Sequence, residues 1–377
     1  MKHWGVYRVL LDFVPSDGTV NHTDLSPAET KRIVTVLRRN RCLGAALCLF
    51  DETGATHTLT FGKAHLKPGV PVQPDTVFRA ASISKFVTGL GVMKLREQGK
   101  IDLDADIGEY LPASVMNRWK PERRITLRSL MTHTAGIRDS EGYNSGIAQG
   151  VPLSEILCDD HVWDGTPGQW EYSNFGAGIA GVVMEAATGV DFETLMQKTV
   201  FEPLGITATY YPQKVQGDLA DAIRILPRSK APNYNAAERR ARPLPPMEVD
   251  LERHYNLAHG NLYISAPELA RLGVAAMKPG FLSQESLHEM RKIDVPFGER
   301  AYNLSQGLFT FVLNEPKICE RLLYGHQGMA YGAVHGLFFD PDRERGMALF
   351  TAGASEARRG VLADLNFDLM KTLWGGG

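Results

Sequence analysis

Strand-like patterns occur at both ends of this chain, and helical patterns fill its middle. Residues 42–50 are continuously apolar, and an alternating segment follows them after the turn D-E-T-G, which predicts a hairpin in a covered sheet. Near the other end, residues 308–313, 332–341 and 346–352 are separated by turn sequences, as in an antiparallel meander. Because 377 residues exceed the usual size of a single core, we expect two lobes, either consecutive or one inserted in the other.

Two helices are predicted from their capping residues. Ser26 and Glu29 form a capping box at the start of a helix over residues 26–40. Ser265 and Glu268 form a second capping box, which begins a helix that returns the chain to the sheet. In both boxes the hydroxyl is expected to accept a hydrogen bond from the first helical turn, which satisfies a backbone amide.

The middle of the chain, residues 101–225, is mostly helical in pattern and is the candidate second lobe. Residues 125–133 and 174–189 are its clearest helical segments. Residues 137–170 contain Gly, Asp, Asn and Pro with little periodicity, which suits a loop that lines a pocket. After the meander, a closing helix over residues 356–374 is expected to cover one face of the sheet.

Residues 77–99 pass from an extended entry straight into a helix that Ser82 opens and Gly99 ends. Ser82 and Lys85 lie one turn apart on one face of that helix. Burial disfavours a charged ammonium, so an amine held beside the hydroxyl could lose its proton and act as its base. The alternative is that Ser82 is only an N-cap and Lys85 a solvated lysine, which is the commoner meaning of so short a pattern.

Two further groups of residues suit a site for a small molecule. Tyr172 and Asn174 stand just before a glycine-rich helix; a phenol near an ammonium can have a lowered pKa and relay a proton, and an asparagine amide can bind a substrate amide. Residues 325–328, G-H-Q-G, stand between two predicted strands, where glycines allow close approach to backbone amides. The structural alternative for Tyr172 and Asn174 is a surface turn, and for His326 it is a hydrogen-bonded histidine within a strand. Residues 227–247, rich in Pro and Arg, suit a solvated loop that could still touch a substrate.

Composition restricts the partners and the compartment. The net charge of −2 gives no electrostatic reason to expect nucleic acid or an acidic membrane, so a small molecule is the default ligand. No run approaches a membrane span, and Arg8 and Asp12 interrupt the apolar stretch at residues 1–14. We therefore expect a cytoplasmic protein without metal or cofactor. Four scattered cysteines are expected to be reduced core thiols: Cys42, Cys48, Cys158 and Cys319.

Three motifs in order along the chain resemble the signature of serine β-lactamases and penicillin-binding proteins: S-I-S-K from Ser82, Y-S-N from Tyr172 and H-Q-G from His326. The segments F-R-A-A-S-I-S-K, L-M-T-H-T-A-G-I and F-E-P-L-G-I are similar to the framework of the class C β-lactamase-like group. That group also contains esterases, D-aminopeptidases and transesterases. The resemblance covers most of residues 28–370.

The resemblance implies the architecture. It is an α/β (α+β) fold of the β-lactamase/transpeptidase type, in which helices flank both faces of an antiparallel sheet. Residues 1–82 and 255–377 would form this sandwich domain, and residues 83–254 would form an inserted, mainly helical domain. The active site would lie at their junction.

The resemblance also implies the catalytic roles. Ser82 would be the acylated nucleophile, and Lys85 and Tyr172 would be its proton-transfer partners, either of which could be the base. The amides of Ser82 and Met329, the residue after Gly328, would form the oxyanion hole. The leading hypothesis is therefore a serine hydrolase that cleaves a small-molecule ester or amide through a covalent acyl-enzyme. The alternatives are an acyltransferase or transesterase, a weak β-lactamase and, outside enzymes, a non-catalytic ligand-binding relative.

The third motif departs from the β-lactamase pattern. His326 stands where a lysine would place a cation beside the carboxylate of a β-lactam, so we expect esters or D-configured amides to be preferred. Asn174 and His326, together with Gly328 and Met329, would contact the substrate. His133 is expected to be a structural residue that closes its helix. The sequence does not indicate an oligomeric state.

Overall fold

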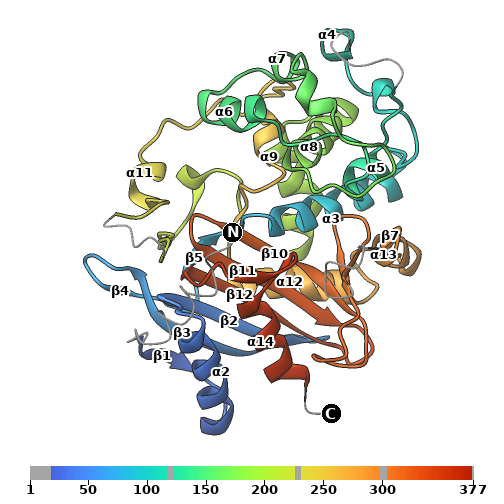
Figure 1. Ribbon diagram of the computed structural model, residues 1–377. Coiled ribbons are helices and arrows are strands. Elements are labelled where there is room, and N and C mark those ends of the chain that lie inside the picture. The colour runs from blue at the N-terminus through green and yellow to red at the C-terminus, as the bar shows by residue number, and fades with distance from the viewer. Residues whose placement is uncertain (1–17, 117–122, 226–230, 297–303, 376–377) are drawn as a thin grey trace.

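The computed structural model describes residues 18–116, 123–225, 231–296 and 304–375 (Figure 1). The apolar stretch at residues 1–14 lies outside them, as do residues 227–230 of the Pro- and Arg-rich segment. A broad sheet occupies one half of the molecule and most helices occupy the other.

The sheet is assembled from both ends of the chain. Its strand order is β1-β3-β2-β12-β11-β10-β9-β8-β7, each neighbouring pair is antiparallel, and β4 pairs with β3. The pairing of β2 with β12 joins the predicted hairpin to the predicted meander. The strands are β1 Val20–Thr23, β2 Gly44–Asp51, β3 Gly54–His65, β4 Val70–Pro71, β7 Val295–Pro296, β8 Leu304–Gln306, β9 Phe311–Leu313, β10 Leu323–Ala330, β11 Ala333–Asp340 and β12 Arg345–Gly353.

Both faces of the sheet are buried, which explains the continuous apolar run in β2. Leu47 packs into the hydrophobic cluster on one face, whereas Ala46 and Cys48 pack into the cluster on the other. Successive side chains of a strand point to opposite faces, so a strand covered twice needs no polar positions. The predicted covered hairpin is therefore confirmed.

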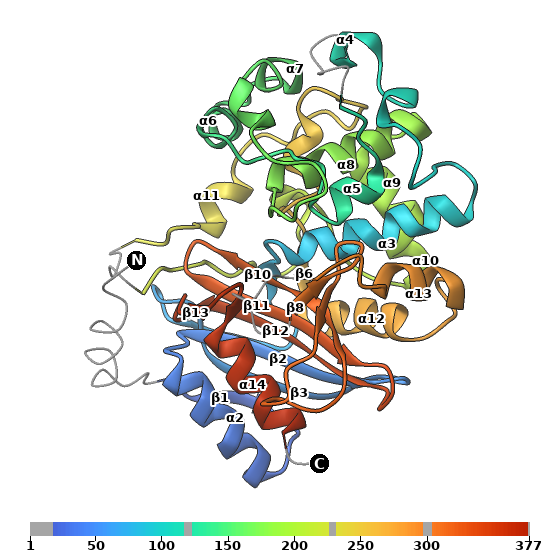
Figure 2. The same ribbon diagram turned by 45° about the vertical axis from the view of Figure 1, so that its right-hand side comes forward.

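Helices cover the sheet from both sides (Figures 1 and 2). The pair α2 and α14 lies on one face, and α12 packs on the other face against β2 and β12. Helix α3 lies where the sheet meets the helical half. The helices are α2 Pro27–Arg39, α3 Ile83–Glu97, α4 Ala113–Met116, α5 Leu127–Met131, α6 Glu141–Gln149, α7 Leu153–Ile156, α8 Asn174–Thr188, α9 Phe192–Met196, α10 Glu202–Leu204, α11 Ala236–Arg240, α12 Ala266–Met277, α13 Gln284–Arg291 and α14 Asp364–Trp374.

The capping boxes have different outcomes. At α2 the box forms as predicted, with the Ser26 side chain accepting from the Glu29 amide. At α12, Ser265 is the N-cap residue but its side chain makes no capping hydrogen bond. Glu268 instead accepts a hydrogen bond from the Thr207 amide at 3.3 Å, so tertiary contact replaces the predicted local one.

The predicted loop at residues 137–170 is partly wrong, because it contains α6 and α7. Helix α6 starts where the Ser140 side chain accepts from the Tyr143 amide, and it ends at Gly150 in the left-handed conformation. Its sequence lacks an apolar stripe, so periodicity does not reveal it. The two capping residues were the available signal.

Two other segments and one cysteine differ from the sequence-based expectation. The closing helix begins at Asp364 rather than at residue 356, because β13 (Arg358–Arg359) and β14 (Leu362–Ala363) first form a short hairpin. The G-H-Q-G segment lies inside β10 rather than between strands. Cys158 is exposed, whereas the other three cysteines are buried thiols, so only those three match the prediction.

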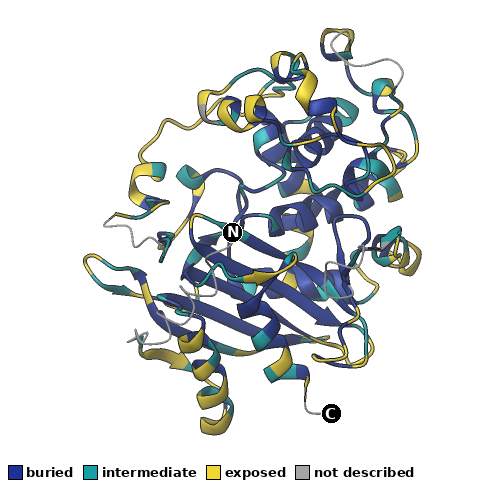
Figure 3. Ribbon diagram, in the orientation of Figure 1, coloured by how far each residue is buried: buried dark blue, intermediate teal, exposed yellow. Residues whose placement is uncertain are grey.

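The hydrophobic core continues from the sheet into the helical half (Figure 3). Phe50 of β2 and Val182 of α8 belong to the same cluster of buried side chains. Because one core spans both halves, it does not mark a boundary between domains, and the domain limits at residues 82 and 255 stay a prediction. Within the described ranges, no single helix is long and apolar enough to cross a membrane. Helix α8 and the segment Phe192–Leu204 together have a sufficient length and apolar composition, but the chain bends by 83° between them.

Candidate active site

A strained connection from β5 (Val77–Arg79) holds Ser82 at the start of α3. Ala81 has a φ of 49°, in the left-handed region that is unfavourable for residues with a Cβ atom. Its carbonyl accepts a hydrogen bond from the Ser84 hydroxyl at 2.6 Å, and the Ala80 amide donates to the Leu262 carbonyl at 2.7 Å. Ser82 is the N-cap residue, but its hydroxyl does not cap the helix. The hydroxyl is therefore oriented for other contacts.

Lys85 is fully buried one turn below Ser82. Its Nζ lies 3.2 Å from Ser82 Oγ, 2.7 Å from Asn174 Oδ1 and 2.8 Å from the His259 carbonyl oxygen. The last two oxygens can only accept hydrogen bonds, so a neutral amine donates its two N–H groups to them and directs its lone pair at the Ser82 hydroxyl. The predicted pairing of Ser82 with Lys85 is therefore present in the structure. The alternative of a solvated lysine is excluded by its burial.

Burial has a strong effect on the Lys85 amine. Loss of solvation lowers the pKa of Lys85 to about 7, the charge of Asp139 opposes this shift, and the charge of Arg79 adds to it. A large part of the amine is therefore unprotonated near neutral pH. A neutral amine beside a hydroxyl can accept its proton.

Tyr172 is close to both Ser82 and Lys85. It shares a hydrogen bond with Ser82, and Lys85 Nζ lies 4.9 Å from the centroid of its ring. Burial raises the pKa of the Tyr172 phenol above its ordinary value. This direction is opposite to the one expected from the sequence, because loss of solvation outweighs the favourable hydrogen bond. Tyr172 therefore keeps its proton, and Lys85 is the better base of the two.

Asp139 organises the N-terminal end of α8, and sequence reasoning missed it. It accepts hydrogen bonds from Asn174 Nδ2 at 2.7 Å, the Phe175 amide at 2.9 Å and the Ser173 hydroxyl at 3.1 Å. Asn174 is thereby fixed with its oxygen toward Lys85. The buried His133 accepts from the Ser173 amide at 3.2 Å, which fits the expected structural role of this histidine.

Gly328 allows β10 to lie against the start of α3. A Cβ atom at this position would lie 2.3 Å from the Ala80 carbonyl oxygen, a distance that requires the backbone to move. Gly328 thus allows close approach to the turn that precedes Ser82. The next residue, Met329, lines the pocket described below, and its assignment to the oxyanion hole stays a prediction.

We expect Gly328→Ala to destabilise the protein by about 1–3 kcal/mol, the usual cost of overpacking, and to lower the reactivity of the Ser82 hydroxyl because the turn that holds Ser82 must shift. Urea unfolding measures the first effect, and the rate of labelling by a fluorophosphonate measures the second. Gly176→Ala in α8 is the matched control, since its Cβ would make only ordinary contacts of 3.4 Å or more. Equal unfolding midpoints for Gly328→Ala and the wild type would contradict this interpretation.

His326 is buried and neutral. Its Nδ1 lies 2.6 Å from the Gln327 carbonyl oxygen, and its ring stacks on Phe311 with centroids 4.2 Å apart. Burial and the charge of Lys85 lower the pKa of His326 to about 3. The third motif therefore supplies an uncharged ring where the family pattern has a cation.

A pocket of about 350 Å³ opens at the junction of the two halves, within the usual size range of small-molecule sites. The structure brings Tyr172, Asn174, His326 and Met329 together around Ser82, with Lys85 below. Residues after β12 also reach the pocket, which the sequence did not suggest. The lining comprises Ser82, Trp170, Tyr172, Asn174, Phe311, His326, Gln327, Met329, Arg358, Gly360 and Val361.

Gln327 fastens the β13–β14 hairpin to the pocket wall. Its Nε2 donates to the Val361 carbonyl, and its Oε1 accepts from the Ala363 amide at 3.0 Å and from Asn366 Nδ2 at 3.3 Å. Both polar atoms of the Gln327 side chain are therefore hydrogen-bonded within the protein. They also place exposed Arg358 in the pocket lining.

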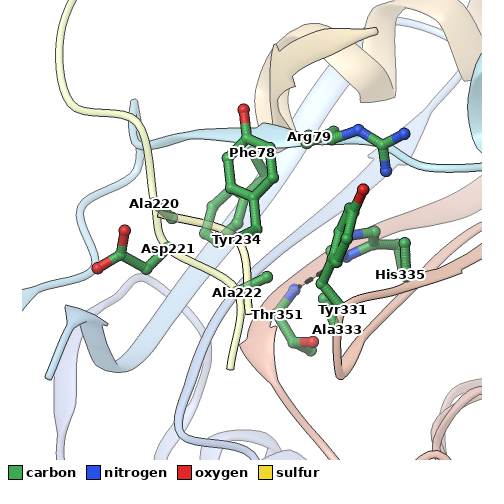
Figure 4. Close-up of a pocket in the computed structure, with 11 residues that line it drawn as sticks. Phe78, Arg79, Ala220, Asp221, Ala222, Tyr234, Tyr331, Ala333, His335 and Thr351 are labelled. Carbon is green, nitrogen blue, oxygen red and sulfur yellow. Dashed lines mark hydrogen bonds between the residues drawn. The ribbon is translucent and has the colours of Figure 1, made fainter. Parts of the chain in front are cut away.

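A second hollow of about 10 Å³ is lined by Phe78, Arg79 and Tyr331 among others and has room for about one water molecule (Figure 4). Arg79 and Tyr331 stand on the same side of it, and the guanidinium carbon lies 5.3 Å from the centroid of the tyrosine ring. Arg79 also donates to Asn261 Oδ1 at 2.9 Å. This hollow is too small for a substrate. The contacts with Asn261 and Tyr331 hold the Arg79 guanidinium, whose charge lowers the pKa of Lys85.

The chain is similar to known proteins over most of its length. The model of the Beta-lactamase family matches residues 30–370. The chain is 27% identical to Esterase EstB of Burkholderia gladioli over 364 residues, which cover 86% of this chain and 90% of that one. It is 30% identical to Penicillin-binding protein 4 of Amycolatopsis lactamdurans over 165 residues, 43% of either chain.

Solved structures show the same fold. The octameric penicillin-binding protein homologue from Pyrococcus abyssi superimposes with a TM-score of 0.73 at 21% identity, covering 92% of this chain and 76% of that one. The expected α/β architecture, with helices on both faces of an antiparallel sheet, is therefore confirmed as the β-lactamase/transpeptidase fold.

Proposed function

This chain belongs to the Beta-lactamase family, and we propose that it is a serine hydrolase that cleaves a small ester or amide through a covalent acyl-enzyme on Ser82. The carrying observation is the buried Lys85 amine, which lies 3.2 Å from the Ser82 hydroxyl and has a pKa lowered to about 7. A base with a pKa near the working pH is well suited to proton transfer. The similarity to an esterase over most of the chain supports the same reaction class.

In the proposed acylation step, neutral Lys85 takes the proton of the Ser82 hydroxyl while Ser82 Oγ attacks the substrate carbonyl carbon. The amides of Ser82 and Met329 would stabilise the resulting oxyanion. Tyr172, which keeps its proton, gives it to the departing alkoxide or amine and takes the proton held by Lys85. The bond to the leaving group breaks, and Lys85 is neutral again for the next step.

Deacylation repeats the sequence with water as the nucleophile. Lys85 takes a proton from water, the hydroxide adds to the acyl carbon, and the proton returns to Ser82 Oγ as the acid departs. An alcohol in place of water would give an ester as the product. Acyl transfer is thus the second candidate, and product analysis with an added alcohol would distinguish it from hydrolysis.

For the substrate we propose esters ahead of β-lactams. An ester leaving group needs little protonation, whereas a β-lactam carboxylate finds a neutral ring at His326. The test is a panel of p-nitrophenyl esters, D- and L-amino-acid amides and a chromogenic cephalosporin, each with a Ser82→Ala control. We expect an ester to give the highest kcat/KM. Faster turnover of the cephalosporin than of every ester would overturn the ranking.

A further inference from the structure

We propose that His326 selects substrates that carry a hydroxyl or amide N–H group near the scissile bond, by accepting a hydrogen bond from that group at Nε2. The proposal rests on the proposed function, because it concerns the substrate of the same pocket. It follows from the tautomer of the ring, from its surroundings and from the other polar groups in the pocket lining.

The backbone fixes the tautomer of His326. A carbonyl oxygen can only accept a hydrogen bond, so Nδ1, 2.6 Å from the Gln327 carbonyl oxygen, must carry the proton. The neutral ring therefore has its lone pair on Nε2. The low pKa caused by burial keeps the ring neutral over the working pH range. Stacking on Phe311 holds the ring plane.

In the part of the chain that the structure describes, Nε2 of His326 has no hydrogen-bond partner, although His326 is only 1% exposed. A buried acceptor without a partner is unfavourable, because it has lost water without replacement. His326 lines the same pocket as Ser82, but Nε2 is closed to solvent in the free protein, so a substrate supplies the missing donor by displacing the pocket side chains that cover this atom. The structure thus offers an acceptor that the protein itself leaves unmatched.

The amide side chains in the lining are already engaged. Asn174 binds Lys85 through its oxygen and Asp139 through its nitrogen. The side-chain nitrogen and oxygen of Gln327 both form hydrogen bonds with the β13–β14 hairpin. His326 therefore remains as an unmatched acceptor whose position is fixed.

A substrate carboxylate has no proton to donate, so its oxygen lone pairs would repel the lone pair on His326 Nε2. This position therefore favours hydrogen-bond donors and disfavours anions. The family pattern, with a lysine in this motif, would favour the reverse. Exposed Arg358 could attract an anionic substrate at the pocket rim. The test must therefore include an anionic ester, and its preferred turnover would count against the proposal.

The experiment compares esters that differ by a hydroxyl in place of a methyl group. On the alcohol side the pair is 2-hydroxyethyl butyrate and propyl butyrate. On the acyl side it is propyl 3-hydroxybutyrate and propyl 3-methylbutyrate, and propyl hydrogen succinate is the anionic ester. We expect the hydroxyl to raise kcat/KM by about 10- to 100-fold in at least one pair, the usual range for satisfying a buried polar group.

Two variants test the residue. His326→Phe keeps a flat ring for stacking and removes the acceptor, so the ratio within the preferred pair should fall to near one. His326→Gln keeps an acceptor oxygen and should retain part of the ratio. The control is His335→Gln, a buried neutral histidine on neighbouring β11 that does not line the active-site pocket (Figure 4). It should keep the wild-type ratio, and thermal melts check the folding of all variants.

Binding to the Ser82→Ala protein separates this proposal from the proposed function. Calorimetry should show the same preference in Kd, without turnover. Preference in binding without any acylation of the wild type would leave the His326 inference standing and remove the proposed function. Normal acylation with equal ratios in wild type and His326→Phe, or with the succinate ester preferred, would overturn the inference alone.

Discussion

Replacement of Lys85 by methionine is expected to lower kcat for an ester by about 10²- to 10⁴-fold, the typical contribution of general acid–base catalysis. Methionine fills a similar volume but cannot accept the Ser82 proton. Tyr172→Phe should lower kcat by a factor in the same range, because it removes the phenol hydroxyl that shares a hydrogen bond with Ser82. Both residues serve the same hydroxyl, so the double variant should lose little more than either single one.

Steady-state kinetics on one ester, arranged as a double-mutant cycle, measures this coupling. Lys94→Met is the control for Lys85, since Lys94 is on the same helix but contacts Glu97 and the Phe281 carbonyl. Tyr143→Phe is the control for Tyr172, because the buried Tyr143 hydroxyl has no hydrogen-bond partner among the described residues. Fully multiplicative losses would show two separate roles, and an unaffected Tyr172→Phe would remove the phenol from the mechanism.

The second large effect is the pH dependence of kcat/KM. If neutral Lys85 is the base, the rate should fall below a midpoint near pH 7, by about tenfold for each further pH unit. The sign follows from the protonated amine being inactive, so activity is present above the pKa and lost below it. Tyr172, with a raised pKa, should add no titration in this range.

Two charge-removing substitutions should move this midpoint in opposite directions. Asp139 raises the pKa of Lys85, so Asp139→Asn should shift the acidic limb to lower pH. Arg79 lowers the same pKa, so Arg79→Gln should shift the limb to higher pH. Profiles of kcat/KM against pH for the wild type and both variants provide the test. Shifts of the same sign, or no shift in either variant, would mean that the acidic fall in kcat/KM is caused by protonation of a group other than Lys85.

Much of the sheet could be predicted because burial on both faces leaves a clear sequence pattern. Residues 42–50 are apolar throughout, and the structure places alternate side chains in two separate clusters. The Ser82 helix was similarly evident from its apolar periodicity and from Gly99, which adopts a φ of 68° at its end. Helix α6 was missed because caps, rather than an apolar stripe, define it.

The site could be predicted in its motif residues but not in its electrostatics. The motifs predicted Ser82 and Lys85 in one place, yet the pKa of Tyr172 depends on burial, which only the folded chain sets. Asp139 lies in a segment without periodicity, and its three hydrogen bonds come from residues 173–175, far along the chain. Likewise, Arg358 reaches the pocket only because Gln327 fastens its hairpin.

The central claim, that Ser82 is the acylated nucleophile, is tested most directly by intact-mass measurement after treatment with a fluorophosphonate. We predict a single adduct, mapped by peptide sequencing to Ser82, that forms slowly in Lys85→Met and is absent from Ser82→Ala. Phosphonylation of a serine requires an activated hydroxyl, and we propose that the Lys85 amine, 3.2 Å from Ser82 Oγ, activates this one. An adduct of equal yield in Ser82→Ala, or one mapped to another residue, would contradict the account.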